Sequence, residues 1–288
     1  TSKLCNYVSK LICNWTTKNT GLSSVFFNAR NMDNLINNIF LYGRDYMKIF
    51  FIERKSLHMF IYIVLISIII FTLSKNKVKP VSYIPINNKI IGIDPGHGGV
   101  DPGAIGISGT KEDEINLKIG LKLKRFIEQN GGRVIMTRET KDGLYTKKSK
   151  SLKEMKTEDL HNRKKIIEEA DCHVFISIHL NSFKESKYYG AQTFYKKNDE
   201  ESKLLASYIQ DELRDVLDKD NNRLPQENED IFLLNEINMP SVLIECGFLS
   251  NPREEELLSR DQYQEKIAWA IYIGIMKYFS QKSGEYSF

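Results

Sequence analysis

From residue 89 onward, short apolar segments alternate with longer segments of helical character. Three of the short segments are almost entirely apolar, at residues 89–94, 172–178 and 241–245. Strands of this kind are buried on both faces, and when helices separate them they indicate a mainly parallel sheet between two helical layers. The sequence therefore predicts an α/β fold: a single domain with a mainly parallel, twisted sheet that helices cover on both faces.

The remaining elements are assigned from periodicity and from stop signals. The apolar residues of 112–129 alternate as they would in a strand, but 18 residues are too many for one strand. The Asn130-Gly131-Gly132 sequence that follows is a helix stop signal, so we predict a helix there. Further strands are expected at 133–136 and 191–195, and further helices at 160–170, 204–216 and 262–279.

An apolar run of 19 residues lies ahead of this domain, at residues 56–74. It is flanked by Arg54 and Lys55 on one side and by Lys75 on the other, and it lacks the polar face of a core helix. About 20 apolar residues match the hydrocarbon thickness of a bilayer. Since no small-residue cleavage pattern follows, we expect an uncleaved signal anchor at 47–79 whose transmembrane helix attaches the chain to a membrane.

The segment before the anchor differs in character from the rest of the chain. Residues 1–46 contain eight Asn and show no sustained periodicity, so we predict a non-native or disordered extension, with Met47 as the natural initiator. Residues 80–88 read as a linker, 89–280 as the folded domain and 281–288 as a tail.

The charge of the chain is unevenly distributed. Residues 1–80 hold 11 Lys and Arg against 3 Asp and Glu, whereas residues 81–288 hold 30 against 34. A mildly acidic folded part has no electrostatic footprint for nucleic acid, while basic residues beside an apolar run suit a membrane surface. We therefore expect no nucleic-acid partner. The four Cys fit no metal-binding or disulfide spacing.

Polar residues gather where the predicted strands end. His97 lies in a glycine-rich loop after the first strand, His179 follows the strand at 172–178, and Glu245 ends the strand at 241–245. Glu112 opens the helix after the glycine-rich loop. Because ligand sites of such sheets lie beyond the carboxyl ends of the strands, these side chains are expected to converge. Two imidazoles and a carboxylate there are the ligand set of a catalytic zinc site, whose fourth position holds water.

Each of these residues also has a structural interpretation. Glu112 alone is typical of a first helical turn, and Asp94 and Asp101 alone are typical of turns. His179 alone is more often a hydrogen-bonded structural residue. Glu245 is harder to explain in this way, because a carboxylate that ends an apolar strand is costly to bury unless it is paired or coordinated. We assign no chemical role to His161, His173 and Cys246.

Four segments together resemble a known family: IGIDPGHGGVDPGAIG, EDEINL, HVFISIHLNS and MPSVLIECGFLSN. They are similar, in order and approximate spacing, to motifs of the amidase-3 family of zinc-dependent N-acetylmuramoyl-L-alanine amidases. With the signal anchor, the chain resembles the sporulation-specific, membrane-anchored type. The resemblance covers about residues 89–280 as a catalytic amidase domain. It implies one Zn²⁺ per chain held by His97, Glu112 and His179, with Glu245 as the catalytic carboxylate.

The function implied by the resemblance is hydrolysis of the amide between N-acetylmuramic acid and L-alanine in peptidoglycan. The amidase domain would then lie outside the cytoplasm, facing the cell wall or spore cortex, and would remove stem peptides during formation of cortex muramic-δ-lactam ahead of germination. Arg163 matches an arginine of the family, with a role in orienting substrate or in packing.

Regulation and two alternative functions stay open from the sequence. The segment after His179 is too short for an inserted helix that would block the cleft, so we expect an open cleft. Control would then come from expression, membrane placement, weak metal retention or an activating protein partner. The alternatives are a non-catalytic peptidoglycan-binding module and a zinc peptidase that acts on stem peptides.

Overall fold

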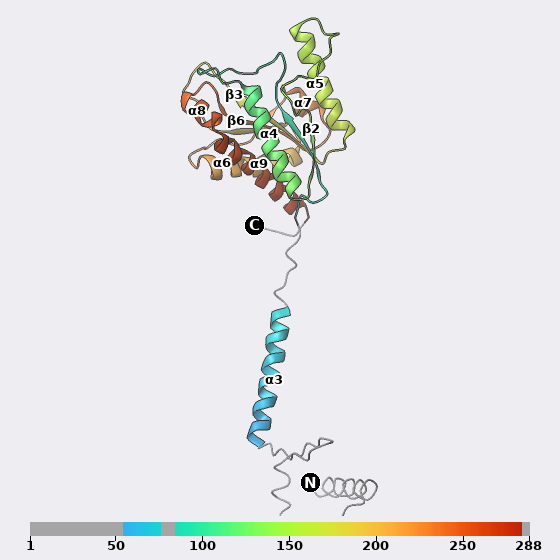
Figure 1. The fold of residues 1–288 in the computed structure, drawn as a ribbon, viewed down its shortest axis with the longest axis vertical. Coiled ribbons are helices and arrows are strands. Elements are labelled where there is room, and N and C mark those ends of the chain that lie inside the picture. Colours follow the sequence, from blue (N-terminus) through green and yellow to red (C-terminus); the bar gives the residue numbers. More distant parts are fainter. Residues whose placement is uncertain (1–53, 76–83, 284–288) are drawn as a thin grey trace, which may run out of the picture. The chain divides into compact units, whose positions relative to one another are not determined.

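The computed structural model describes residues 54–75 and 84–283 (Figure 1). By their internal contacts the residues group into two units, Thr1–Val81 and Ser82–Phe288. Several predictions lie outside the described residues: the extension at 1–46 with the start at Met47, the first part of the linker at 80–83, and the end of the tail at 284–288.

The first unit contributes one described helix, α3 (Arg54–Lys75). It includes the segment 56–74, which was expected to be helical. In the part of the chain that the structure describes, no helix combines the length and the apolarity needed to cross a membrane. The predicted transmembrane span is therefore not confirmed.

The second unit is built on a six-stranded sheet. Its strands are β1 (Ile90–Pro95), β2 (Arg133–Met136), β3 (Val174–Asn181), β4 (Gln192–Lys196), β5 (Gln226–Asn228) and β6 (Ser241–Phe248). They lie in the order β2-β1-β3-β6-β4-β5, and every neighbouring pair is parallel except β4 and β6. The predicted mainly parallel α/β domain is confirmed, with one antiparallel junction.

Helices cover both faces of this sheet (Figure 1). The larger core joins one face to α4 (Glu112–Gln129), α6 (Glu200–Leu217) and α9 (Asp261–Lys282). A smaller apolar cluster joins the other face to α5 (Leu152–Glu169) and α7 (Phe232–Glu236), and α8 (Pro252–Ser259) follows β6. The strand alternation explains the two layers: Ile91 and Ile93 belong to the larger core, and Ile90 packs against the smaller cluster.

Helix α4 has the predicted bounds, and its packing explains the misleading alternation. Ile115, Ile119, Leu123 and Ile127 are buried at a spacing of four residues, whereas Leu121 is exposed.

Helix α5 begins eight residues before the predicted start. Its first half is strongly polar, so periodicity did not reveal it, and it begins at a cap in which the Ser151 hydroxyl accepts from the amide of Glu154.

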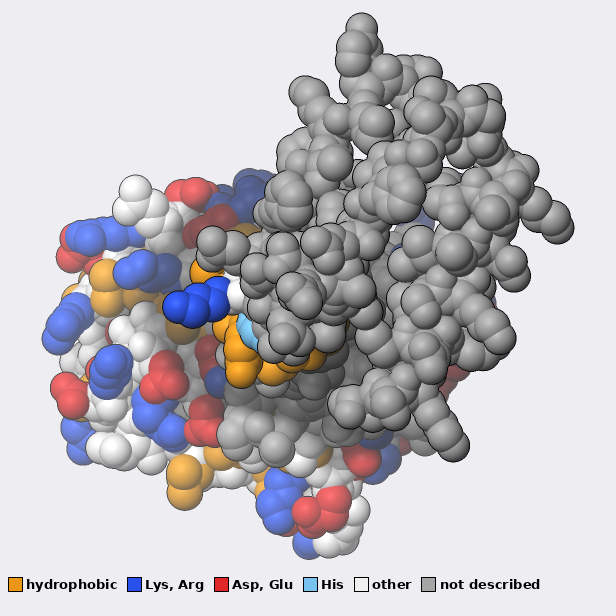
Figure 2. Space-filling view, turned by 90° about the horizontal axis from the view of Figure 1, so that it is seen from below, with side chains coloured by type: hydrophobic (Ala, Val, Ile, Leu, Met, Phe, Trp, Pro, Cys, Tyr) orange, Lys and Arg blue, Asp and Glu red, His pale blue; other side chains and the backbone are white. Residues whose placement is uncertain are grey.

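Part of the surface of this unit carries charges of both signs. On the face seen in Figure 2, Lys and Arg side chains are interspersed with Asp and Glu and do not gather by sign. The segment between β3 and β4, residues 182–191, forms turns without a helix, which confirms the prediction that no helix is inserted there.

Candidate metal centre

Four chain segments bring the predicted site residues to the carboxyl edge of the sheet. His97 lies two residues after β1, and Glu112 is the first residue of α4. His179 and Glu245 both lie within their strands, β3 and β6, because each strand continues for three residues beyond its predicted end. The parallel arrangement of β1, β3 and β6 is what brings these residues together.

His97, Glu112 and His179 form a compact group. Their ligand atoms all lie within 4.8 Å of one another. Glu112 Oε1 lies 3.2 Å from His97 Nε2 and 3.0 Å from His179 Nδ1. Glu112 is buried, at 3% exposure, while both imidazoles are partly exposed, so a ligand can reach the group from solvent.

The donor set fits a zinc ion. Zn²⁺ binds imidazole nitrogen and carboxylate oxygen at about 2.0–2.2 Å, which places two tetrahedral ligands roughly 3.3 Å apart. The two nitrogen–oxygen distances in the group are close to that value. Three protein ligands of these types are typical of catalytic sites with one position left for water or substrate.

His97 is oriented by a carboxylate on its far side. Asp101 Oδ2 lies 2.8 Å from His97 Nδ1, so Nε2 is the nitrogen that faces Glu112. Carboxylate contacts of this kind fix the tautomer and ring direction of metal-binding histidines. Burial lowers the pKa of His97, but hydrogen bonds to Asp101 and Glu112 outweigh it and raise the pKa to about 9. Binding of a metal would therefore displace a proton from this imidazole.

Glu112 and His179 are held by backbone groups. The amides of Ala104 and Leu180 donate to the two oxygens of Glu112, at 2.8 and 3.0 Å. Burial raises the pKa of Glu112. Hydrogen bonds to His179 and His97 lower it by more than burial raises it, so the pKa lies well below the ordinary value for a glutamate. The ring of His179 packs on Gly96, where an added Cβ would lie 2.2 Å from Nε2. Gly96 therefore provides the space that His179 occupies.

Glu245 lies beside this group with a buried oxygen that lacks a partner. It pairs in register with His179 across β3 and β6. Its Oε2 is buried and has no hydrogen-bond partner among the described residues. Burial is the largest influence and raises the pKa of Glu245 to about 7, against the opposing effect of His179. A carboxylate beside an ion site whose surroundings favour its protonated form in this way suits general acid–base work.

A buried ion pair supports the loop that carries His97. Arg163 is 1% exposed and donates through Nη1 to Asp94 at 2.6 Å. It also donates to the carbonyl oxygens of Pro95 and His97, and Arg138 donates to those of Pro95 and Gly96. All three nitrogens of Arg163 are engaged, so of the two expected roles the structure supports packing of the loop. The part played by Arg138 was not predicted.

The other candidates do not belong to the metal-ligand group. Asp94 is buried in β1, and Asp101 contacts His97, so neither is only a turn residue. His161 is exposed on α5, with Nδ1 2.7 Å from the carbonyl oxygen of Thr157. The predicted strand at 172–178 includes His173, but β3 begins only at Val174, so His173 precedes the strand. Cys246 is 1% exposed and packs within the core, which agrees with the absence of a chemical role.

Comparisons with known proteins agree with this geometry. Residues 91–277 match the family model described as N-acetylmuramoyl-L-alanine amidase. The germination-specific N-acetylmuramoyl-L-alanine amidase of Bacillus subtilis strain 168 is 41% identical over 204 residues, which cover 71% of this chain and 85% of that protein.

Solved structures give the same result. The CwlD amidase from Clostridioides difficile, solved in complex with the GerS lipoprotein, is 55% identical, with a TM-score of 0.66, and the match covers 67% of this chain and 100% of that one. An N-acetylmuramoyl-L-alanine amidase from Clostridium difficile 630 is 30% identical, with a TM-score of 0.59 over 68% of this chain and 99% of that one. The chain therefore belongs to the N-acetylmuramoyl-L-alanine amidase family that its four motifs predicted.

Proposed function

We propose that this protein hydrolyses the amide bond between N-acetylmuramic acid and L-alanine in peptidoglycan. The observation that carries the proposal is the convergence of His97, Glu112 and His179 beside Glu245, in a chain of the amidase family. A module that only bound peptidoglycan would have no need for a carboxylate with a buried, unpartnered oxygen at this place.

Zn²⁺, one per chain, is the proposed cofactor, with His97, Glu112 and His179 as its ligands. When bound, zinc lowers the pKa of water from about 16 toward 7 and polarises a carbonyl group as a Lewis acid. The carboxylate of Asp101 keeps His97 in the tautomer that presents Nε2.

Glu245 is the proposed general base and acid. Its Oε2 would accept a proton from the attacking water and then deliver a proton to the nitrogen of the departing alanine. In the metal-free protein, burial raises the pKa of Glu245 to about 7, so its surroundings favour uptake of a proton more than water does. No covalent intermediate is needed, and the buried Cys246 has no part in the reaction.

The biological setting is part of the proposal. The substrate places the amidase domain outside the cytoplasm, at the cell wall or spore cortex. Similarity to a germination-specific amidase supports a role in removing stem peptides during formation of cortex muramic-δ-lactam. The complex of the related CwlD amidase with the GerS lipoprotein supports a protein partner that activates this chain.

Digestion of purified peptidoglycan by the full chain with zinc tests the activity. The expected result is new L-alanine amino termini, which disappear when a chelator removes the metal and return when zinc is restored. Peptide fragments with other new termini would indicate the zinc peptidase, and binding without any new termini would indicate the binding module. Either outcome overturns the proposal.

The ligand assignment has a separate test. His179→Ala is expected to lose zinc as well as activity, because two ligands hold the ion much more weakly than three. The matched control is His161→Ala, which removes an exposed imidazole from α5 and is expected to keep the zinc. Stoichiometric zinc in folded His179→Ala protein would contradict the assignment.

A further inference from the structure

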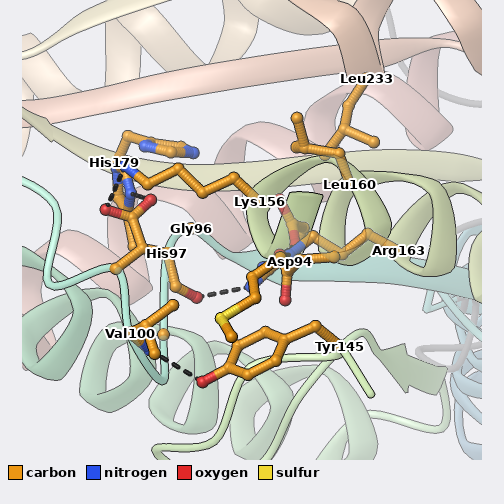
Figure 3. Close-up of a pocket in the computed structure, with 14 residues that line it drawn as sticks. Asp94, Gly96, His97, Val100, Tyr145, Lys156, Leu160, Arg163, His179 and Leu233 are labelled. Carbon is orange, nitrogen blue, oxygen red and sulfur yellow. Dashed lines mark hydrogen bonds and ion pairs between the residues drawn. The ribbon is translucent and has the colours of Figure 1, made fainter. Parts of the chain in front are cut away.

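A cavity of about 170 Å³ opens beside the metal-ligand group (Figure 3). It lies on the β1 side of His179, where Asp94, Gly96 and His97 contribute to its lining. Glu245 lies in β6, on the other side of β3. The reacting group therefore has Glu245 on one side and this cavity on the other.

The walls of the cavity are largely apolar. They come from the loop after β1, from the loop before α5, and from α5 and α7, through Val100, Tyr145, Met155, Leu160 and Leu233. The Tyr145 hydroxyl accepts from the amide of Val100 at 3.0 Å, which leaves its own proton free to be donated. Such a surface suits short aliphatic groups together with a few polar contacts.

One exposed ammonium group also lines the cavity. Lys156 reaches from α5 toward His97 and His179, and its Nζ lies 2.8 Å from Asp101 Oδ1 (Figure 3). An ammonium group has three donors, so this contact leaves two for a ligand. The other cation of the described lining, Arg163, is 1% exposed and already donates to four protein groups.

The segment around Lys156 is basic. Residues 141–156 contain six Lys and two acidic residues, although residues 81–288 as a whole are net acidic. Of this segment, Tyr145, Met155 and Lys156 line the cavity, and the lining also holds Asp94, Asp101 and Asp159. Each of these carboxylates already contacts a protein cation: Arg163 pairs with Asp94 and Asp159, and Lys156 pairs with Asp101. Lys156 is the cation of this lining with donors left for a ligand carboxylate.

We propose that this cavity binds the peptide side of the scissile bond, and that Lys156 binds a carboxylate on the residue after the alanine. The inference rests on the proposed amidase function. One extended residue spans about 3.3–3.6 Å, so that carboxylate lies roughly 7 Å from the scissile carbonyl. The carboxylate of Asp101 contacts both Lys156 Nζ and His97 Nδ1, at 2.8 Å each, so the ammonium group lies within one bridging carboxylate of a proposed metal ligand.

The size of the cavity favours a peptide over a sugar chain. Pockets that enclose whole small ligands have volumes of about 300–1,000 Å³. A cavity of about 170 Å³ takes only one or two residues of a larger substrate. The alanine methyl group and the aliphatic part of the next residue fit walls made of Val100, Met155 and Leu160.

The test compares two peptidoglycan fragments that differ only in a carboxylate or a carboxamide on the residue after the alanine. The full-length protein with zinc is expected to prefer the carboxylate by about tenfold or more in kcat/KM, mainly through KM, since charge-assisted hydrogen bonds are the strong ones. In Lys156→Gln that ratio is expected to fall toward one. Lys156→Arg is expected to restore part of it, and Lys153→Gln, one turn earlier on the exposed side of α5, to keep it.

Zinc content is measured for every variant, because Lys156 also contacts Asp101. A ratio near one in the natural protein, or an unchanged ratio in Lys156→Gln, would overturn the inference. Calorimetric titration of both fragments onto zinc-loaded Glu245→Gln gives the comparison without turnover. If Glu245→Gln binds the carboxylate fragment preferentially while the zinc-loaded protein with Glu245 intact cleaves neither fragment, the subsite is supported and the proposed function alone is overturned.

Discussion

Glu245 in β6 lies in register with His179 in β3, so both side chains project from neighbouring strands onto the same face of the sheet. Successive strand residues face opposite sides, and a slip by one position would put Cys246 in the place of Glu245. Because both strands are buried and apolar along most of their length, this register is strongly specified. The sheet itself therefore sets the relation between the general base and one metal ligand.

Replacement of Glu245 by Gln tests this relation directly. The amide keeps the shape of the side chain but cannot take up a proton, so turnover is expected to fall by about 10²-fold or more while zinc content stays the same. Glu227→Gln, on the exposed part of β5, serves as the control. Turnover within tenfold of the natural protein would show that Glu245 is not the base.

The same substitution predicts a pH-dependent change in stability of the metal-free protein. Burial raises the pKa of Glu245 from 4.5 to about 7 in the folded state. Between these values the folded state keeps a proton that the unfolded state has released, so this group makes the protein less stable as pH rises. Glu245→Gln is expected to raise the free energy of unfolding at pH 8 by roughly 1–3 kcal/mol and to leave it unchanged near pH 4. Urea unfolding after chelation measures both, and equal stabilities at pH 8 would contradict the assigned pKa.

The elements that sequence patterns predicted are those with a strong apolar signal. The central strands are apolar along most of their length, and α4 has a buried stripe and a clear stop. Elements without such a signal were missed. β5 consists of Gln226, Glu227 and Asn228, and α7 has only five residues, too short for helical periodicity to be read.

The candidate site likewise contains residues that the sequence could predict and supporting contacts that it could not. The residues with the proposed chemical roles could be predicted because parallel strands deliver their carboxyl ends to one edge. Their supports could not, because these depend on contacts between distant segments. Arg138 donates to the carbonyl oxygen of Asp113, and Lys156 to Asp101, and neither contact leaves a pattern along the chain.

The buried pair of Asp94 and Arg163 predicts a large effect on stability. Arg163→Met leaves Asp94 buried, with only the hydroxyls of Thr137 and Ser177 as donors, and is expected to cost about 3–5 kcal/mol. Adding Asp94→Asn removes the unpaired charge and is expected to recover part of that loss. Chemical unfolding at pH 7 measures both variants. If the double variant is no more stable than Arg163→Met, the cost arises from lost packing and not from the unpaired charge.

Substitution of Gly96 is expected to weaken metal binding although no metal ligand is replaced. In Gly96→Ala the new Cβ would lie 2.2 Å from Cε1 and Nε2 of His179, so the imidazole must move away from Glu112. Changes in groups that orient metal ligands lower metal affinity by about 10–100-fold, and a similar loss is expected here. Gly109→Ala is the control, because a Cβ there meets no atom within 4 Å, although its φ of +84° adds backbone strain in the loop before α4. Zinc affinity is measured by competition with a chelator, and equal affinities in the two variants would show that the ring of His179 is not held in place by the glycine beneath it.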